Sequence, residues 1–176
     1  MSTRILAISG SLRRESHNSL LLRLAQEHAP DGVDVVIWDG LADVPAYNED
    51  HEVDPGPAVI ALRTAIVDAD ALLIATPEYN FGVPGALKNA LDWASRPYGA
   101  SALSGIPASV MGASPSSFAA SQSRGDLRRA LALSGASVDE ETIGFRSERL
   151  TTERAAVVAE VTDVVRALAG RIGVPV

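Results

Sequence analysis

The sequence of Thr76–Trp93, TPEYNFGVPGALKNALDW, contains the features that decide the fold. A short apolar run, Ala71–Ala75, precedes it and is typical of a buried strand. A loop with two prolines and two glycines follows, and then an amphipathic helix with Pro84 near its first turn. A strand, an ordered loop and a helix form the unit from which open α/β sheets are built. Such sheets bind ligands beyond the carboxyl ends of their strands.

The rest of the chain repeats this alternation of strand and helix. Strands are predicted at Ile5–Ile8, Val33–Trp38, Ala71–Ala75, Ala108–Met111 and, more weakly, Ala136–Val138 with a possible extension towards Ile143. Helices are predicted over Ser19–His28, Val59–Val67, the stretch after Pro84, Leu127–Leu133 and Thr151–Ile172, while Asp39–Pro57 is predicted to be a loop. This pattern predicts a single α/β domain over residues 1–176. Its architecture is a flavodoxin-like, doubly wound, five-stranded parallel sheet of order 2-1-3-4-5 with helices on both faces.

Composition excludes several classes of function. The net charge of −7 and the pI near 4.9 provide no basic field for nucleic acid. The chain has no cysteine, and its three histidines lack the spacing of metal ligands, so no metal site is expected. No apolar run approaches the ~18 residues of a membrane span, and the N-terminus lacks the layout of a signal peptide. We therefore expect a cytoplasmic protein that does not bind membranes.

The loop Gly10–Asn18, GSLRRESHN, follows the first strand and leads into a helix. Hydroxyl, amide and guanidinium groups at a helix N-terminus suit a phosphate monoester, and Arg13 adds a positive charge. The alternative is that Ser16, Asn18 and Ser19 only cap the helix, but capping needs one such residue and does not need Arg13. The loop has neither the lysine of a Walker motif nor a G-x-G-x-x-G pattern. It therefore favours a mononucleotide over a dinucleotide.

The loop Thr76–Gly85 is stiffened by prolines and glycines and contains Tyr79 and Phe81. These aromatic rings could line a flat heterocycle, or they could fill the core of the protein. Composition alone does not separate these two interpretations.

Two stretches resemble a known family. GSLRRESHNSLLLRLA and ATPEYNFGVPGALKNALDWASRP are similar to the NAD(P)H-dependent FMN reductase family, which includes quinone, chromate and azo-dye reductases. The similarity continues through DVPAYNEDHE and AIVDADALLIATPEYN, and it covers most of the first 115 residues. One departure lies after the fourth predicted strand, where GASPSSFAASQSRGDLRRAL has serine and alanine in place of most of the family's glycines.

The resemblance implies a set of FMN-binding residues. Those implied for the phosphate are Ser11, Arg13, Ser16, His17 and Asn18. Those implied for the flavin ring are Pro77, Glu78, Tyr79, Asn80, Phe81 and Gly82, and Ser114 would complete the pocket. No catalytic side chain is implied, because N5 of the flavin carries the chemistry.

The same resemblance implies a ping-pong enzyme. NADPH or NADH would transfer hydride to the flavin, and a quinone, free flavin, chromate or azo compound would then take the electrons. A homodimer or homotetramer is expected, and Trp93 and Arg96–Tyr98 are candidates for a subunit contact or, equally, for ordinary packing. The alternatives are a flavodoxin-type electron carrier, which lacks NAD(P)H activity, and a flavin-binding module without turnover.

Overall fold

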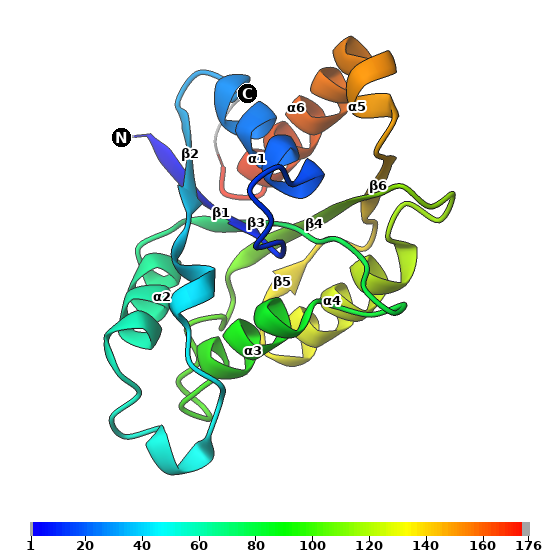
Figure 1. The fold of residues 1–176 in the computed structure, drawn as a ribbon. Coiled ribbons are helices and arrows are strands. Elements are labelled where there is room, and N and C mark those ends of the chain that lie inside the picture. The colour runs from blue at the N-terminus through cyan, green and yellow to red at the C-terminus, as the bar shows by residue number, and fades with distance from the viewer. Residues whose placement is uncertain (1, 174–176) are drawn as a thin grey trace.

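Every strand of the sheet runs parallel to its neighbours, as the alternation of strands and helices predicts. The computed structural model describes residues 2–173. The strands are β1 (Thr3–Ser9), β2 (Val33–Trp38), β3 (Ala71–Ala75), β4 (Pro107–Ser114), β5 (Ser137–Val138) and β6 (Ile143–Arg146). Their order is β2-β1-β3-β4-β5, with β6 also paired to β4 (Figure 1). The predicted order 2-1-3-4-5 is therefore confirmed.

The fifth position of the sheet is divided between two strands. β5 pairs with Pro107 and Ala108 at the start of β4, and β6 pairs with the end of β4 from Met111 onwards. Side chains from other elements hold the connecting residues 139–142, because Arg171 bonds Asp139 at 2.5 Å and Arg124 bonds the carbonyl of Thr142 at 2.7 Å. The single weak strand predicted near Ala136–Val138 is therefore corrected to two short strands.

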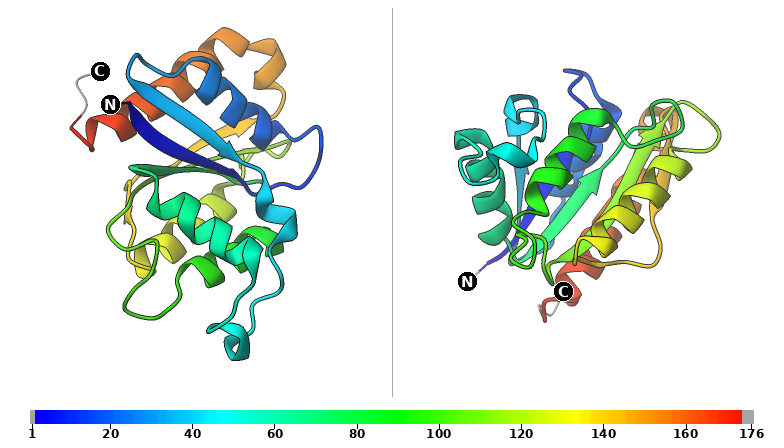
Figure 2. Two further views of the ribbon diagram at one scale, coloured as in Figure 1. Left: turned by 90° about the vertical axis from the view of Figure 1, so that its left-hand side faces the viewer. Right: turned by 90° about the horizontal axis from the view of Figure 1, so that it is seen from below.

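Helices cover both faces of the sheet. On one face lie α1 (His17–Glu27), α5 (Arg149–Thr152) and α6 (Arg154–Gly170), and on the other lie α2 (Pro57–Val67), α3 (Gly85–Ala94) and α4 (Ser121–Leu133) (Figures 1 and 2). Successive side chains of a strand point to opposite faces, so each buried strand contributes to two cores. In β1, Leu6 and Ile8 enter the core under α2–α4, whereas Ile5 and Ala7 enter the core under α1 and α6.

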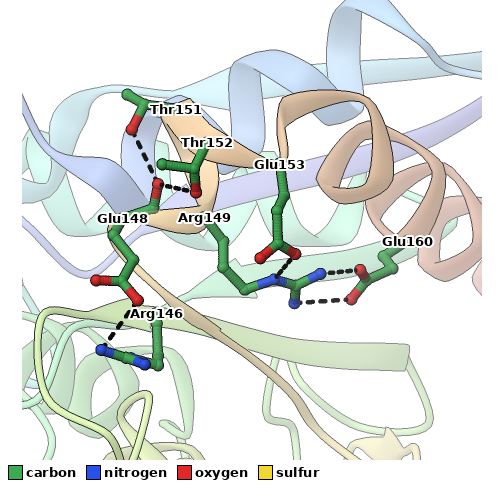
Figure 3. Close-up of polar contacts among 7 residues, drawn as sticks. All are labelled: Arg146, Glu148, Arg149, Thr151, Thr152, Glu153 and Glu160. Atoms are coloured by element: carbon green, nitrogen blue, oxygen red, sulfur yellow. Dashed lines mark hydrogen bonds and ion pairs between the residues drawn. The ribbon is translucent and has the colours of Figure 1, made fainter.

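The C-terminal helix is also divided, at Glu153, where the backbone leaves the helical region with φ −130°. Figure 3 shows the polar contacts around this break. The guanidinium of Arg149 bonds Glu153 at 2.7 Å and Glu160 at 2.5 Å, and these hydrogen-bonded carboxylates raise the pKa of Arg149 above its ordinary value. The hydroxyls of Thr151 and Thr152 donate to the carbonyl of Glu148 at 2.9 and 3.0 Å. The predicted continuous helix Thr151–Ile172 is thus replaced by α5 and α6.

The segment Asp39–Pro57, predicted to be a loop, contains two short 3-10 turns, η1 (Gly40–Asp43) and η2 (Glu49–His51). Asn89 of α3 accepts a hydrogen bond from the N–H of Tyr47 at 2.7 Å, and it donates one to the carbonyl of Pro45 at 2.8 Å. Trp93 also donates to Pro45, at 2.8 Å, and its ring meets that of Tyr47 edge to face at 4.9 Å. The segment is therefore packed against α3.

Trp93 is fully buried by these contacts, with 0% of its surface exposed. Of the two roles considered for it, ordinary packing is correct and a subunit contact is not, because its own chain covers it. Tyr98, five residues later, is 91% exposed. Within residues 2–173, no helix is both long enough and apolar enough to cross a membrane.

Candidate cofactor site

The loop between β1 and α1 places a helix N-terminus at the carboxyl end of the sheet. Ser16 is the N-cap of α1, and its hydroxyl accepts from the N–H groups of Asn18 and Ser19 at 3.2 and 3.3 Å. The first N–H bonded within the helix is that of Leu20, to the carbonyl of Ser16. Among residues 2–173, no atom accepts a hydrogen bond from the N–H of His17. Ser16 therefore caps the helix, and the N–H of His17 is still available to donate a hydrogen bond to an anion.

Asn18 joins this loop to the end of β4. Its side-chain oxygen accepts from the N–H of Ala113 at 2.8 Å, and its amide nitrogen donates to the carbonyl of Ala113 at 3.0 Å. The residue is 3% exposed, so the pair of bonds is buried. Asn18 can offer a ligand only its second amide hydrogen, because the other polar groups of the side chain bond β4.

A small cavity of about 70 Å³ unites the three loops that follow β1, β3 and β4. It is lined by Ser11, Arg13, Ser16, His17, Asn18, Pro77, Glu78, Tyr79, Ala113, Ser114 and Pro115. The structure therefore brings together the residues that the sequence assigned to a phosphate with the first residues assigned to a ring. Ala113 and Pro115 were missed, although their position beside Ser114 after a predicted strand was the signal that could have found them.

The chemistry of this cavity fits the phosphate end of a mononucleotide. Its donors include three serine hydroxyls, the Arg13 guanidinium and a helix N-terminus, all of which favour a phosphate. Ligand pockets for whole small molecules span about 300–1,000 Å³, so this cavity cannot enclose a complete nucleotide. A second hollow, of about 410 Å³, shares Arg13 and Tyr79 with the cavity and also contacts Leu12 and Pro84. Larger parts of a ligand therefore have room beside the cavity, on the open side of the loops.

Asn80, Phe81 and Gly82 do not line the small cavity. They form a tight turn, in which Tyr79 and Gly82 exchange hydrogen bonds of 3.2 and 3.1 Å between their N–H and carbonyl groups. Asn80 and Phe81 at its tip have φ of 50° and 61°, the left-handed region required by a two-residue turn of this type. That conformation costs about 1–2 kcal/mol for a residue with a side chain such as phenylalanine.

The aromatic side chains of this turn face outward. Tyr79 is 49% exposed and Phe81 is 75% exposed, so neither fills the core. Of the two interpretations left open by composition, the structure excludes core packing for Phe81. A strained turn that displays aromatic rings beside a cavity is typical of a functional site.

The serine- and alanine-rich loop after β4 is held by Arg124. The guanidinium donates to the carbonyl of Ala119 at 3.0 Å and to the carbonyl of Thr142 at 2.7 Å. Burial lowers the pKa of Arg124, and the charge of Glu78 partly offsets that effect. Ala119 and Ala120 have φ of 48° and 61°, which makes this a second strained segment near the site. Glycine would adopt such angles without strain.

Together these features define a class of protein: a flavodoxin-like α/β protein with a cavity at the carboxyl ends of β1, β3 and β4 whose lining suits an anion. The profile of the NADPH-dependent FMN reductase family matches residues 3–147. The chain belongs to this family of NAD(P)H-dependent, FMN-containing oxidoreductases.

Individual relatives agree with this assignment. The chain is 45% identical over 129 residues to an NAD(P)H-dependent FMN reductase of Pseudomonas aeruginosa, an alignment that covers 73% of this chain and 69% of the relative. It is 43% identical over 114 residues to a 2-hydroxy-1,4-benzoquinone reductase of a Burkholderia species, covering 65% of this chain and 62% of the relative. The second alignment thus spans less than two thirds of that enzyme.

Among solved structures, a flavoenzyme NAD(P)H:(acceptor) oxidoreductase from Paracoccus denitrificans superposes with a TM-score of 0.85. The two sequences are 30% identical, and the match covers 97% of each chain. The similarity therefore extends over the whole fold, including the C-terminal part that the family profile does not reach.

Proposed function

We propose that this protein transfers electrons from NADPH or NADH, through bound FMN, to quinones or similar small acceptors. The observation that carries the proposal is the cavity that joins three loops at the N-terminus of α1, in a chain that belongs to the FMN reductase family. FMN, when bound, supplies the hydride and electron chemistry. The relatives named for FMN and benzoquinone reduction support the choice of acceptor.

In this proposal the residues of the chain bind and orient the cofactor. Ser11, Ser16 and Arg13 hold the phosphate, with His17 and Asn18 beside it and the positive end of α1 pointing at it. The turn Pro77–Gly82 lines the ring, and the backbone N–H groups at its tip, those of Asn80 and Phe81, stabilise negative charge at the ring's polar edge. Ser114 closes the cavity from the end of β4. No side chain acts as acid, base or nucleophile.

The proposal is tested on the purified protein. After incubation with FMN and removal of the unbound cofactor, we expect a yellow protein with a flavin spectrum. At catalytic protein concentrations it should oxidise NADPH or NADH when menadione is present. A colourless protein that takes up no FMN would contradict the proposal.

Two alternative functions predict a different result in this assay, namely a protein that binds FMN but does not oxidise NAD(P)H. A flavodoxin-type electron carrier would bind FMN but would not turn over NAD(P)H, and a flavin-binding module would bind FMN without reacting with either substrate. The observation against both is membership of a family of NADPH-dependent reductases.

The order of the two half-reactions is also part of the proposal. If NAD(P)⁺ leaves before the acceptor binds at the same open face, double-reciprocal plots at several menadione concentrations should be parallel. Intersecting lines would show that both substrates bind together. The assay run with NADH and with NADPH gives the coenzyme preference.

A homodimer or homotetramer and a cytoplasmic location complete the proposal. Because Trp93 is buried within its own chain, a subunit contact must use other residues. Light scattering of the FMN-loaded protein measures the assembly, and a mass equal to the 18.4 kDa chain would refute self-association.

A further inference from the structure

Helix α4 begins without a cap of its own. Its N-cap residue, Ala120, has no side chain that can accept a hydrogen bond, and the first turn contains no acidic residue. The first N–H groups of a helix need acceptors from outside the helix, and a negative charge there is favourable. Glu78, in the loop after β3, supplies both. Its carboxylate oxygen Oε2 accepts from the N–H of Gln122 at 2.9 Å and from the N–H of Ser123 at 3.1 Å.

A second contact joins the loop after β3 to α4, at Thr76, two residues before Glu78. The hydroxyls of Thr76 and Ser123 lie 2.8 Å apart, and both residues are completely buried. The backbone of β4 also lies close behind the loop, because a Cβ atom on Gly112 would come within 2.6 Å of the carbonyl oxygen of Thr76. The start of the loop after β3 is therefore fixed against both α4 and β4.

Glu78 is followed at once by the strained turn. Residues in the left-handed region persist only when the surrounding structure holds them there. Phe81 is mostly exposed, so its own packing cannot provide that restraint. The restraint comes from the two hydrogen bonds between Tyr79 and Gly82 within the turn and from the bonds at its base, two of which Glu78 makes.

We propose that Glu78 is a positioning residue, which holds the turn Tyr79–Gly82 in its flavin-binding conformation by capping α4, without itself binding the flavin. The inference rests on the proposed function and changes the role that the sequence resemblance implied for Glu78. The carboxylate is engaged by the amides of α4, although the residue borders the cavity.

The cap links two loops of the site. The first turn of α4 also carries Arg124, which bonds the carbonyl of Ala119 in the loop after β4. One helix terminus thus anchors the turn after β3 through Glu78 and the loop after β4 through Arg124. Loss of the cap should loosen both loops.

Three substitutions separate positioning from direct contact. Glu78→Gln keeps the reach and an acceptor oxygen but removes the charge. Glu78→Asp keeps the charge but shortens the side chain, so that it no longer reaches both amides. Glu78→Ala removes both properties. Glu141→Ala is the control, because Glu141 is an exposed glutamate outside the cavity.

Two measurements are needed, one of them without FMN. Titration of the apoprotein with FMN gives the dissociation constant, and amide hydrogen exchange of the apoprotein reports on residues 79–82 and 122–123 directly. For the Asp and Ala variants we expect a dissociation constant about tenfold higher, equivalent to ~1.4 kcal/mol, and faster exchange in both segments. The Gln variant should stay within about threefold of the wild type, because it retains the acceptor. The control should match the wild type.

Specific outcomes overturn the inference. Weak FMN binding by Glu78→Gln together with wild-type exchange would show that the charge contacts the ligand directly. Wild-type affinity in Glu78→Asp and Glu78→Ala would show that the cap does not position the turn. If the wild type itself binds no FMN, the proposed function fails; the exchange data then decide separately whether Glu78 holds the turn. Should Glu78→Ala not fold, the Asp and Gln pair still gives the comparison.

Discussion

Arg13 lies where the two hollows of the site meet, since it lines both the cavity of about 70 Å³ and the larger one of about 410 Å³. Within residues 2–173 its side chain makes one weak bond, from Nη2 to the carbonyl of Glu15 at 3.4 Å. The guanidinium is therefore available to an anion at the N-terminus of α1. The sequence could predict this position, because an arginine in a serine-rich loop before a helix is a local signal.

Arg13→Ala should weaken FMN binding about 10- to 100-fold, because a hydrogen bond to a charged group contributes roughly 1.5–3 kcal/mol. The fold should be unchanged, since Arg13 is exposed. Arg14→Ala is the matched control; Arg14 is the adjacent exposed arginine and lines neither hollow. Equal FMN affinity in the two variants would remove the phosphate assignment of Arg13.

Asn18 shows what a local signal cannot reveal. Its place at the start of a helix suggested a phosphate contact, yet its side chain bonds the backbone of Ala113, 95 residues away. A bond of that kind depends on the register of β4 beside α1, which no local pattern contains. Whether Asn18 also contacts FMN stays a prediction.

We expect Asn18→Ala to lower the free energy of unfolding by about 2–4 kcal/mol, because it leaves a buried N–H and a buried carbonyl without partners. Asn48→Ala, which removes an exposed cap of η2, should cost at most about 1 kcal/mol. Denaturant unfolding of both apoproteins measures the difference. Similar losses would show that the Asn18 bonds do not brace the loop.

At the scale of elements, the sequence predicted the strands and helices that have their own periodicity. It placed the start of α4 at Leu127, whereas the helix begins at Ser121, because its first turn is capped by Glu78 from another loop. It also predicted one continuous C-terminal helix, whereas the backbone leaves the helical region at Glu153, between α5 and α6. Boundaries set by distant contacts were missed, and boundaries set by proline or by a local cap were close.

The turn after β3 gives a prediction about strain. Phe81→Gly should be more stable than Phe81→Ala by about 1 kcal/mol, because glycine adopts a φ of 61° without penalty and alanine does not. Phe118 is the control, since it is also exposed but lies outside the left-handed region. There the order should reverse, with Phe118→Gly less stable than Phe118→Ala by roughly 0.5–1 kcal/mol. Thermal unfolding of the four apoproteins provides the comparison, and the same order at both positions would contradict the strained turn.

At the scale of the whole molecule, parallel pairing brings the loops after β1, β3 and β4 to one end of the sheet (Figure 1). The alternation of strands and helices was enough to predict this arrangement, and with it the position of the site. What the sequence could not show is how the loops are joined: through Asn18 to β4, and through Glu78 and Thr76 to α4. The site therefore depends on contacts between segments far apart in the chain.

The central claim is that electrons pass from NAD(P)H to a quinone through FMN held at this site. Anaerobic mixing of the FMN-loaded protein with NADPH or NADH, followed by menadione, tests both steps in one experiment. We expect the flavin absorbance to bleach with either or both coenzymes and to return fully on addition of menadione. A flavin spectrum that neither coenzyme changes would contradict the account.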